Sequence, residues 1–273
     1  MMMEGKNKAN YMPLIFEEEG LETGRPGFLS GFSPNGAVAD AFYIRSLSRE
    51  EKTVPVIPDS RITLVFRGRD SNVSSYICGV TEEIKKLVIS PGECCIFIKF
   101  TPGAGSLLLN EPAGSIANRA VPLNGELKRG SHPVSRAKAL MKEPDSGLPP
   151  GSNIYLIKYC TDRILQERGN IRIEALAAER GVTSRYIGKI FEKYVGTSPK
   201  IYSQIIKLRF SMEKILEERD RLLVDIATDS GFFDHAHMNR MYKKLIHCSS
   251  GDFRRNLFKG LDYSKVDDYI SAG

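Results

Sequence analysis

Short apolar runs separated by turn residues dominate the first half of the chain. Between about residues 27 and 126 these runs are rich in β-branched and aromatic residues, and Gly, Pro, Asn and Asp lie between them. Strands of this length, repeated at short intervals, predict an antiparallel β-sandwich or barrel. The clearest runs are 41–44, 62–66, 76–78, 87–89 and 95–98.

The pattern changes after residues 142–152, which are too rich in Pro and Gly to continue a helix or strand. Beyond this segment, apolar residues recur every three or four positions to about residue 258, which is the periodicity of α-helices. We therefore expect a β-rich domain over 1–141, a linker over 142–152, an all-α domain over 153–260 and a C-terminal tail over 261–273. The predicted fold class is α+β with two domains.

The helical half contains an internal repeat. Ala177 precedes Gly181 by four residues, and fifty residues later Ala227 precedes Gly231 by the same interval. A small alanine lets two helices approach closely, and a glycine four residues later takes the turn between them. The repeat predicts two helix-turn-helix motifs in tandem.

Composition and charge agree with a globular protein that binds a polyanion. The chain has 273 residues, of which 41% are apolar and 26% charged. Residues 1–149 hold 18 Lys and Arg against 17 Asp and Glu, whereas residues 150–260 hold 20 against 13. The excess positive charge therefore belongs to the helical half, as expected if that half binds nucleic acid. No apolar run approaches the roughly 20 residues of a membrane span, and we expect a cytoplasmic protein without membrane contact.

The two repeats and the sequence between them resemble the DNA-binding domain of the AraC/XylS family of bacterial transcription regulators. The resemblance spans about residues 172–255. The first motif is Leu176-Ala177-x3-Gly181-Val182-Thr183-x2-Tyr186-Ile187-x-Lys189-x-Phe191, and it continues into Gly196-Thr197-Ser198-Pro199-x2-Tyr202. The second is Ile226-Ala227-x3-Gly231-Phe232-x-Asp234-x3-Met238-x-Arg240-x-Tyr242-Lys243-Lys244, followed by Phe253-Arg254.

This resemblance implies a sequence-specific regulator that binds double-stranded DNA. It implies a cupin-like β domain that binds a small-molecule effector of unknown identity, dimerises, or does both. RNA polymerase and a second copy of the chain are further partners that it suggests. No catalytic motif is recognisable, so we expect no enzymatic activity, no metal and no cofactor.

The first recognition helix is expected over about 184–194. Its apolar positions would face the core and leave Ser184, Arg185, Gly188 and Lys189 toward the major groove. Arg185 and Lys189 can donate hydrogen bonds to guanine. The alternative is that both contact only phosphates, and for Lys189 the two interpretations are equal, because a flexible ammonium reads bases poorly. Gly196 is placed to end this helix, and Ser198 and Pro199 to begin a connecting helix of roughly 20 residues.

The second recognition helix is expected to begin at Asp234 as N-cap. Its larger number of polar side chains favours the second motif as the principal reader of bases. Further along the chain, basic residues are suited to phosphates. The predicted DNA contacts here are His235, His237, Asn239, Arg240, Lys243, Lys244 and Arg254.

The chain departs from the family pattern after this helix, where His247 and Ser250 replace the usual Gly and Pro. We therefore expect a differently capped end of the second motif. In the β half, the adjacent Cys94 and Cys95 would point to opposite faces of a strand and pack as thiols. Two alternatives remain open, namely a thiol- or redox-responsive regulator and a protein-interaction module that uses the helical domain.

Overall fold

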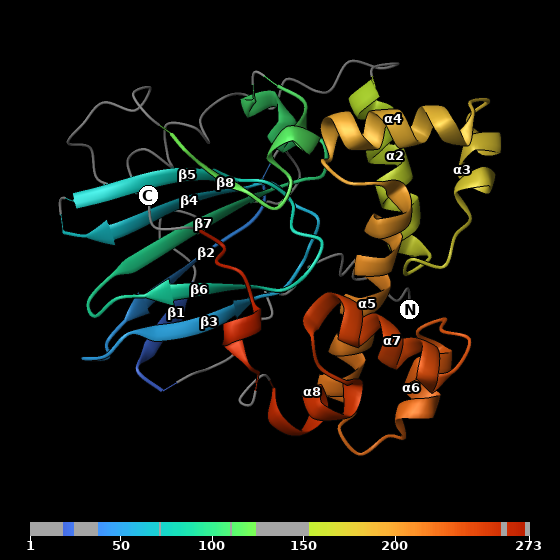
Figure 1. The fold of residues 1–273 in the computed structure, drawn as a ribbon. Coiled ribbons are helices and arrows are strands. Elements are labelled where there is room, and N and C mark those ends of the chain that lie inside the picture. Colours follow the sequence, from blue (N-terminus) through green and yellow to red (C-terminus); the bar gives the residue numbers. More distant parts are fainter. Residues whose placement is uncertain are drawn as a thin grey trace, which may run out of the picture.

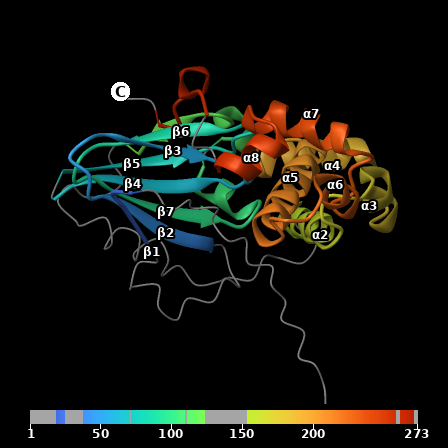
Figure 2. The same ribbon diagram turned by 90° about the horizontal axis from the view of Figure 1, so that it is seen from below.

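The computed structural model describes residues 19–24, 38–70, 72–109, 111–123, 153–257 and 261–270. An antiparallel β domain precedes a helical domain, which confirms the predicted fold class (Figure 1). The predicted linker over 142–152 lies outside the described residues. Figure 2 shows the helices gathered at one end of the sheets.

The β domain consists of two antiparallel sheets among the described residues. The larger sheet has the order β1-β2-β7-β4-β5-β8, and the smaller pairs β3 with β6. The strands are β1 (Leu21–Gly24), β2 (Val38–Ser46), β3 (Lys52–Val56), β4 (Thr63–Arg69), β5 (Asn72–Cys78), β6 (Lys85–Ile89), β7 (Cys94–Phe100) and β8 (Ala120–Pro122).

Period-two alternation along the strands builds a core on each face of the larger sheet. On β7, for example, Cys95 and Phe97 face the smaller sheet, whereas Ile96 and Ile98 face the opposite side. That opposite side is covered by the short 3₁₀ helix η3 (Ala113–Ile116) and by Leu109, which directly follows the 3₁₀ helix η2 (Ala104–Leu108). Two apolar faces explain why the β7 sequence is almost continuously apolar.

The helical domain contains two helix-turn-helix units joined by α5. No helix in the described parts of the chain is long and apolar enough to cross a membrane. The helices are α2 (Asn153–Gln166), α3 (Ile173–Glu179), α4 (Ser184–Tyr194), α5 (Pro199–Glu217), α6 (Leu223–Asp229), α7 (His235–Ile246) and α8 (Ser250–Asn256).

Helix α5 contributes to the cores of both units. Near its start, Tyr202 and Ile206 pack with α2, α3 and α4. Further along, Leu208, Met212 and Ile215 pack with α6, α7 and α8. The two units therefore share one rigid connecting element.

The C-terminal segment 261–270 is packed against both domains, although the sequence suggested only a tail there. It contains the short 3₁₀ helix η4 (Tyr263–Lys265), and Val266, Tyr269 and Ile270 are all buried. A segment of ten residues is too short for its apolar spacing to predict how it packs, so this packing could not be read from the sequence pattern.

Candidate nucleic-acid interface

Helix α4 has the boundaries and the buried face expected of a recognition helix. Thr183 is its N-cap, and the Thr183 Oγ1 accepts a hydrogen bond of 3.1 Å from the Tyr186 amide. Ile187, Ile190 and Phe191 are buried in the first unit's core. Because these residues fix the rotation of the helix, its other side faces solvent.

The exposed side of α4 carries cations that no neighbour neutralises. Arg185 and Lys189 are exposed and make no hydrogen bond or ion pair with any described residue. Ser184 is half-buried at the helix start, and a Cβ at Gly188 would meet nothing within 4 Å. This surface therefore offers positive charge and open space for a close approach.

Helix α7 begins as predicted at Asp234. The Asp234 Oδ1 accepts a hydrogen bond of 2.5 Å from the His237 amide, which satisfies a free N–H of the first turn. Met238, Met241 and Tyr242 are buried in the second unit's core. The opposite face again points toward solvent.

Three side chains predicted to contact DNA from α7 are already engaged within the protein. The Asn239 Oδ1 accepts hydrogen bonds from the Ser250 amide at 2.9 Å and the Ser250 hydroxyl at 2.7 Å. His235 Nε2 lies 3.1 Å from both Asn239 Nδ2 and Ser250 Oγ. His237 Nδ1 accepts a hydrogen bond from the Phe233 amide at 3.4 Å. Asn239 and His235 thus tie α7 to α8.

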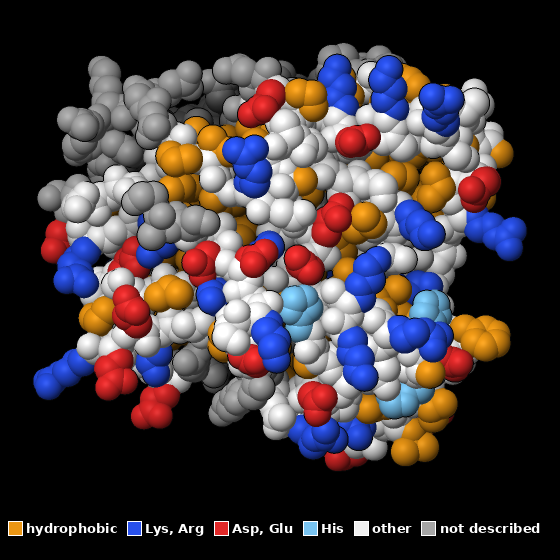
Figure 3. Space-filling model, in the orientation of Figure 1, with side chains coloured by type: hydrophobic (Ala, Val, Ile, Leu, Met, Phe, Trp, Pro, Cys, Tyr) orange, Lys and Arg blue, Asp and Glu red, His pale blue; other side chains and the backbone are white. Residues whose placement is uncertain are grey.

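The basic residues of this unit divide into free and engaged groups. Arg240, Lys243 and Lys244 are exposed and form no hydrogen bond or ion pair within the described parts of the chain. Arg254 instead donates a hydrogen bond of 2.9 Å to the Arg221 carbonyl. Figure 3 shows Lys and Arg side chains gathered over the helices, whereas acidic and basic side chains mix over the sheets.

The end of α7 is capped in an unusual way, as the sequence predicted. His247 takes the left-handed conformation with φ of 57°, a position that normally favours Gly. Ser249 then forms a capping box with Asp252 at the start of α8, and Ser250 is the first helical residue. A second cap thus replaces the rigidity that Gly and Pro would give.

One exposed residue beside α7 was missed in the sequence. Phe233 has 91% of its surface exposed, in the turn immediately before the helix. The signal was the pair Phe232-Phe233, since a tight turn can bury only one of two adjacent aromatic rings, and Phe232 is buried. An exposed ring at this position can contact sugars or thymine methyl groups.

A single loop of the β domain contacts the ends of both recognition helices. The Glu82 Oε1 accepts a hydrogen bond of 2.6 Å from the Thr197 hydroxyl, just after α4. Two residues on, the Ile84 amide donates to the Leu245 carbonyl near the end of α7 at 2.7 Å. We call residues 79–84, which join β5 to β6, the clamp loop.

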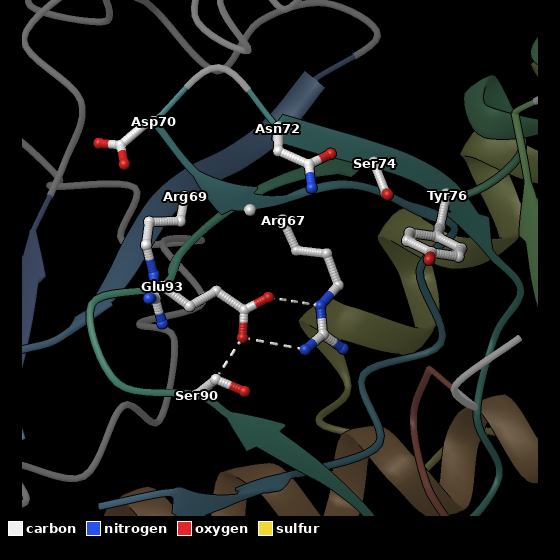
Figure 4. A pocket seen from close by; sticks show the side chains of 9 residues that line it. Arg67, Arg69, Asp70, Asn72, Ser74, Tyr76, Ser90 and Glu93 are labelled. Carbon is white, nitrogen blue, oxygen red and sulfur yellow. Dashed lines mark hydrogen bonds and ion pairs between the residues drawn. The ribbon is translucent and has the colours of Figure 1, made fainter. Parts of the chain in front are cut away.

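A polar pocket of about 560 Å³ lies at the opposite ends of the same two strands. Arg67 and Glu93 form a bidentate pair there, with N···O distances of 2.7 and 3.0 Å, and the Ser90 amide also donates to Glu93 (Figure 4). Ser74 and Tyr76 of β5 line the pocket beside the Arg67 guanidinium. The pocket and the clamp loop are thus joined by β5 and β6.

The thiols of the β domain are in environments that suppress their reactivity. Cys95 is buried and Cys94 half-buried, on opposite faces of β7 as predicted. Burial raises the pKa of both thiols, and it raises the pKa of the nearby Cys78 to about 12. All three remain protonated at neutral pH, which disfavours thiol-based sensing.

Comparison with known proteins gives two family matches. Residues 176–256 match a family described as a helix-turn-helix domain, which covers the end of α3 and all of α4, α5, α6, α7 and α8. Residues 36–122 match a family described as a domain of unknown function (DUF6597). The chain is also 29% identical over 92 residues to a probable transcription factor, PqrA from Proteus vulgaris, across 34% of this chain and 75% of that protein.

Two solved structures of ToxT from Vibrio cholerae are loosely similar to most of this chain. One shares 10% identity with a TM-score of 0.41 and covers 80% of this chain and 98% of that chain. The other, from strain O395, shares 10% identity with a TM-score of 0.40 and covers 89% of this chain and 100% of that chain.

Proposed function

Because the chain belongs, through its tandem helix-turn-helix region, to the AraC/XylS family of transcription regulators, we propose that α4 and α7 enter successive major grooves of one DNA site. The observation that carries this proposal is the pair of capped helices that both expose unneutralised cations on the side away from their cores. Such a pair recognises DNA from one protein chain.

The length of α5 supports this arrangement. A helix of 19 residues spans about 28 Å at 1.5 Å per residue. Successive major-groove faces on one side of B-DNA lie roughly 34 Å apart. Because α5 packs into the cores of both units, it holds the two recognition helices at a separation close to this spacing.

We assign base reading mainly to the two arginines. Arg185 and Arg240 each present a planar fork that can bond guanine O6 and N7 together. The lysines and Ser184 are better suited to phosphates, because an ammonium group has no fixed hydrogen-bonding plane. His235, Asn239 and Arg254 support the fold around these contacts. The assigned phosphate contacts are Ser184, Lys189, Lys243 and Lys244.

We also propose that the β domain modulates DNA binding through a small effector or through dimerisation. The connection between the polar pocket and the clamp loop supports this part, since β5 and β6 extend from one to the other. A change in the pocket can therefore alter the contacts at Thr197 and Leu245. Coupling between two such sites is typically about 1 to 3 kcal/mol.

The test is DNA binding by the full chain across a salt series. We expect the logarithm of the affinity to fall with the logarithm of salt by roughly 0.9 per neutralised phosphate. Combining Lys189→Ala with Lys243→Ala should reduce this slope by roughly two. Arg49→Ala is the matched control, because Arg49 is an exposed cation on the β domain. A slope unchanged in the double variant, or reduced equally by the control, contradicts the assignment.

A further inference from the structure

The C-terminal segment joins the core of the helical domain to the core of the β domain. Val266 is buried with residues of α5, α7 and α8. Three residues later, Tyr269 is buried between the two sheets, together with Ile270. Figure 1 shows this segment leaving the last helices and running beside β6. We call residues 266–270 the strap.

An isolated parallel bridge between Lys86 of β6 and Asp268 joins the strap to the smaller sheet. The Lys86 amide donates to the Asp267 carbonyl at 2.9 Å, and the Tyr269 amide donates to the Lys86 carbonyl at 2.7 Å. Side-chain contacts are peripheral, since Asp267, which lies 2.9 Å from the Lys85 ammonium, is 78% exposed. Only two backbone hydrogen bonds to Lys86 are described for the strap, so its buried side chains Val266, Tyr269 and Ile270 supply most of its attachment.

The Tyr269 side chain fills a site built for an aromatic ring and one hydroxyl group. The ring packs among apolar residues that include Phe97 and Leu87. The side chains of Thr63 and Cys78 lie near its hydroxyl in the interior. Burial raises the pKa of Tyr269 well above its ordinary value, so its hydroxyl is uncharged at neutral pH.

We propose that the space between the two sheets binds a small, uncharged aromatic molecule with a single hydroxyl, which replaces Tyr269 and releases the strap from β6. Such a ligand reproduces both the packing of the ring and the position of its hydroxyl beside Thr63 and Cys78. This proposal deepens the proposed function and rests on it for its consequence, because it names an effector class and gives it a site separate from the polar pocket.

Release of the strap would reach the second recognition helix directly. Lys85 and Lys86, which hold the strap, follow immediately after Ile84 of the clamp loop, and Ile84 bonds to Leu245 of α7. Val266 packs in the same core as α7. A ligand that displaces Tyr269 therefore removes one of the attachments that fix α7 relative to the β domain.

Binding of p-cresol and toluene to the full chain, measured by calorimetry, tests the site. Tyr269→Ala removes the competing side chain, so p-cresol should bind this variant at least tenfold more tightly than the wild type. Toluene should bind it about fivefold more weakly than p-cresol, since it cannot replace the hydroxyl. Lys265→Ala, an exposed change beside the strap, is the control and should behave as wild type.

Tyr269→Phe provides the same test in a variant that keeps the ring and its packing. It should bind p-cresol more tightly than wild type, by a smaller factor than Tyr269→Ala. Equal p-cresol affinities for the wild type and the folded variants overturn the proposal. Equal affinities of Tyr269→Ala for p-cresol and toluene overturn the assigned ligand class.

The consequence for DNA is measured separately. Saturating p-cresol should shift the DNA affinity of the wild type in the same direction as Tyr269→Ala does alone, and should cause no further shift in that variant. If p-cresol binds as expected but leaves DNA affinity unchanged, the strap is not a regulatory link. If the chain binds no DNA at all, the proposed function fails, while calorimetry still decides the ligand site.

Discussion

The polar side chains of α4 and α7 differ in whether they are already hydrogen-bonded within the protein or are available to contact DNA. A count of polar residues in the sequence favours α7, which carries His235, His237, Asn239 and Arg240. Three of these four are hydrogen-bonded within the protein, so Arg240 is the one whose side chain forms no hydrogen bond or ion pair with any described residue. On α4, Arg185 is equally free, and the open surface at Gly188 permits a close approach. The count of polar side chains, which ranked α7 first as the reader of bases, therefore does not favour either motif.

We predict that Arg185→Ala and Arg240→Ala each relax base preference in one half of the DNA site by a similar amount. A lost bidentate contact to guanine should remove about 1 to 3 kcal/mol of discrimination. Selection from a library of randomised sites at fixed salt measures this, with circular dichroism to confirm folding. Loss of preference in both halves from either variant alone would show that one motif dominates.

Helix ends were the most predictable elements, because capping is a local property of the sequence. Asp234, Ser198 and Gly196 take the positions predicted for them, and Pro199 begins α5. Each of these residues acts through its own backbone or the next turn. The role of Asn239 was not predictable, because its partner Ser250 lies eleven residues away across a turn whose geometry the pattern does not define.

The cap at His247 gives a prediction for the end of α7. A non-glycine residue at a left-handed position costs roughly 1 kcal/mol, so His247→Gly should stabilise the chain by about that amount. The lost contact with Glu83 at 3.4 Å is exposed and should subtract only a few tenths of a kcal/mol. Urea unfolding measures the change.

His247→Ala is the matched control for this prediction. It removes the same imidazole contact but keeps a Cβ in the left-handed conformation, so it should not stabilise the chain. If Ala and Gly have the same effect, the imidazole rather than the backbone determines the stability of this cap.

The arrangement of the whole molecule was only partly predictable. The order of a β half and a helical half followed from the change in periodicity, and it is confirmed. The way in which the two halves attach to each other could not be predicted from periodicity, because it depends on isolated contacts such as those of Ile57 and Ile84 in the second unit's core. Arg209 of α5 likewise reaches the Pro58 carbonyl, beside the buried pair of Asp59 and Lys99. Isolated residues of this kind leave no periodic signal.

That buried pair shows that the attachment involves charge as well as apolar packing. Burial alone would raise the pKa of Asp59, but the positive charges of Lys99 and Arg209 lower it below its ordinary value. The carboxylate is therefore ionised at neutral pH, between a strand of the β domain and the connecting helix. Removing one member would leave a buried charge uncompensated, so the pair favours one docked arrangement over others.

The clamp loop should set how strictly the protein measures the distance between the two halves of its DNA site. Glu82→Ala and Thr197→Val each remove the hydrogen bond after α4, and a double-mutant cycle on stability should give a coupling of roughly 1 to 2 kcal/mol.

Without this restraint, the end of α4 can shift relative to α7. The preference for the natural half-site spacing over a site lengthened by one base pair should then fall about threefold, measured by gel shift at fixed salt. Glu83→Ala serves as the comparison, because its contact with His247 is exposed. If the clamp variants keep the full spacing preference of the wild type, α5 alone fixes the two helices.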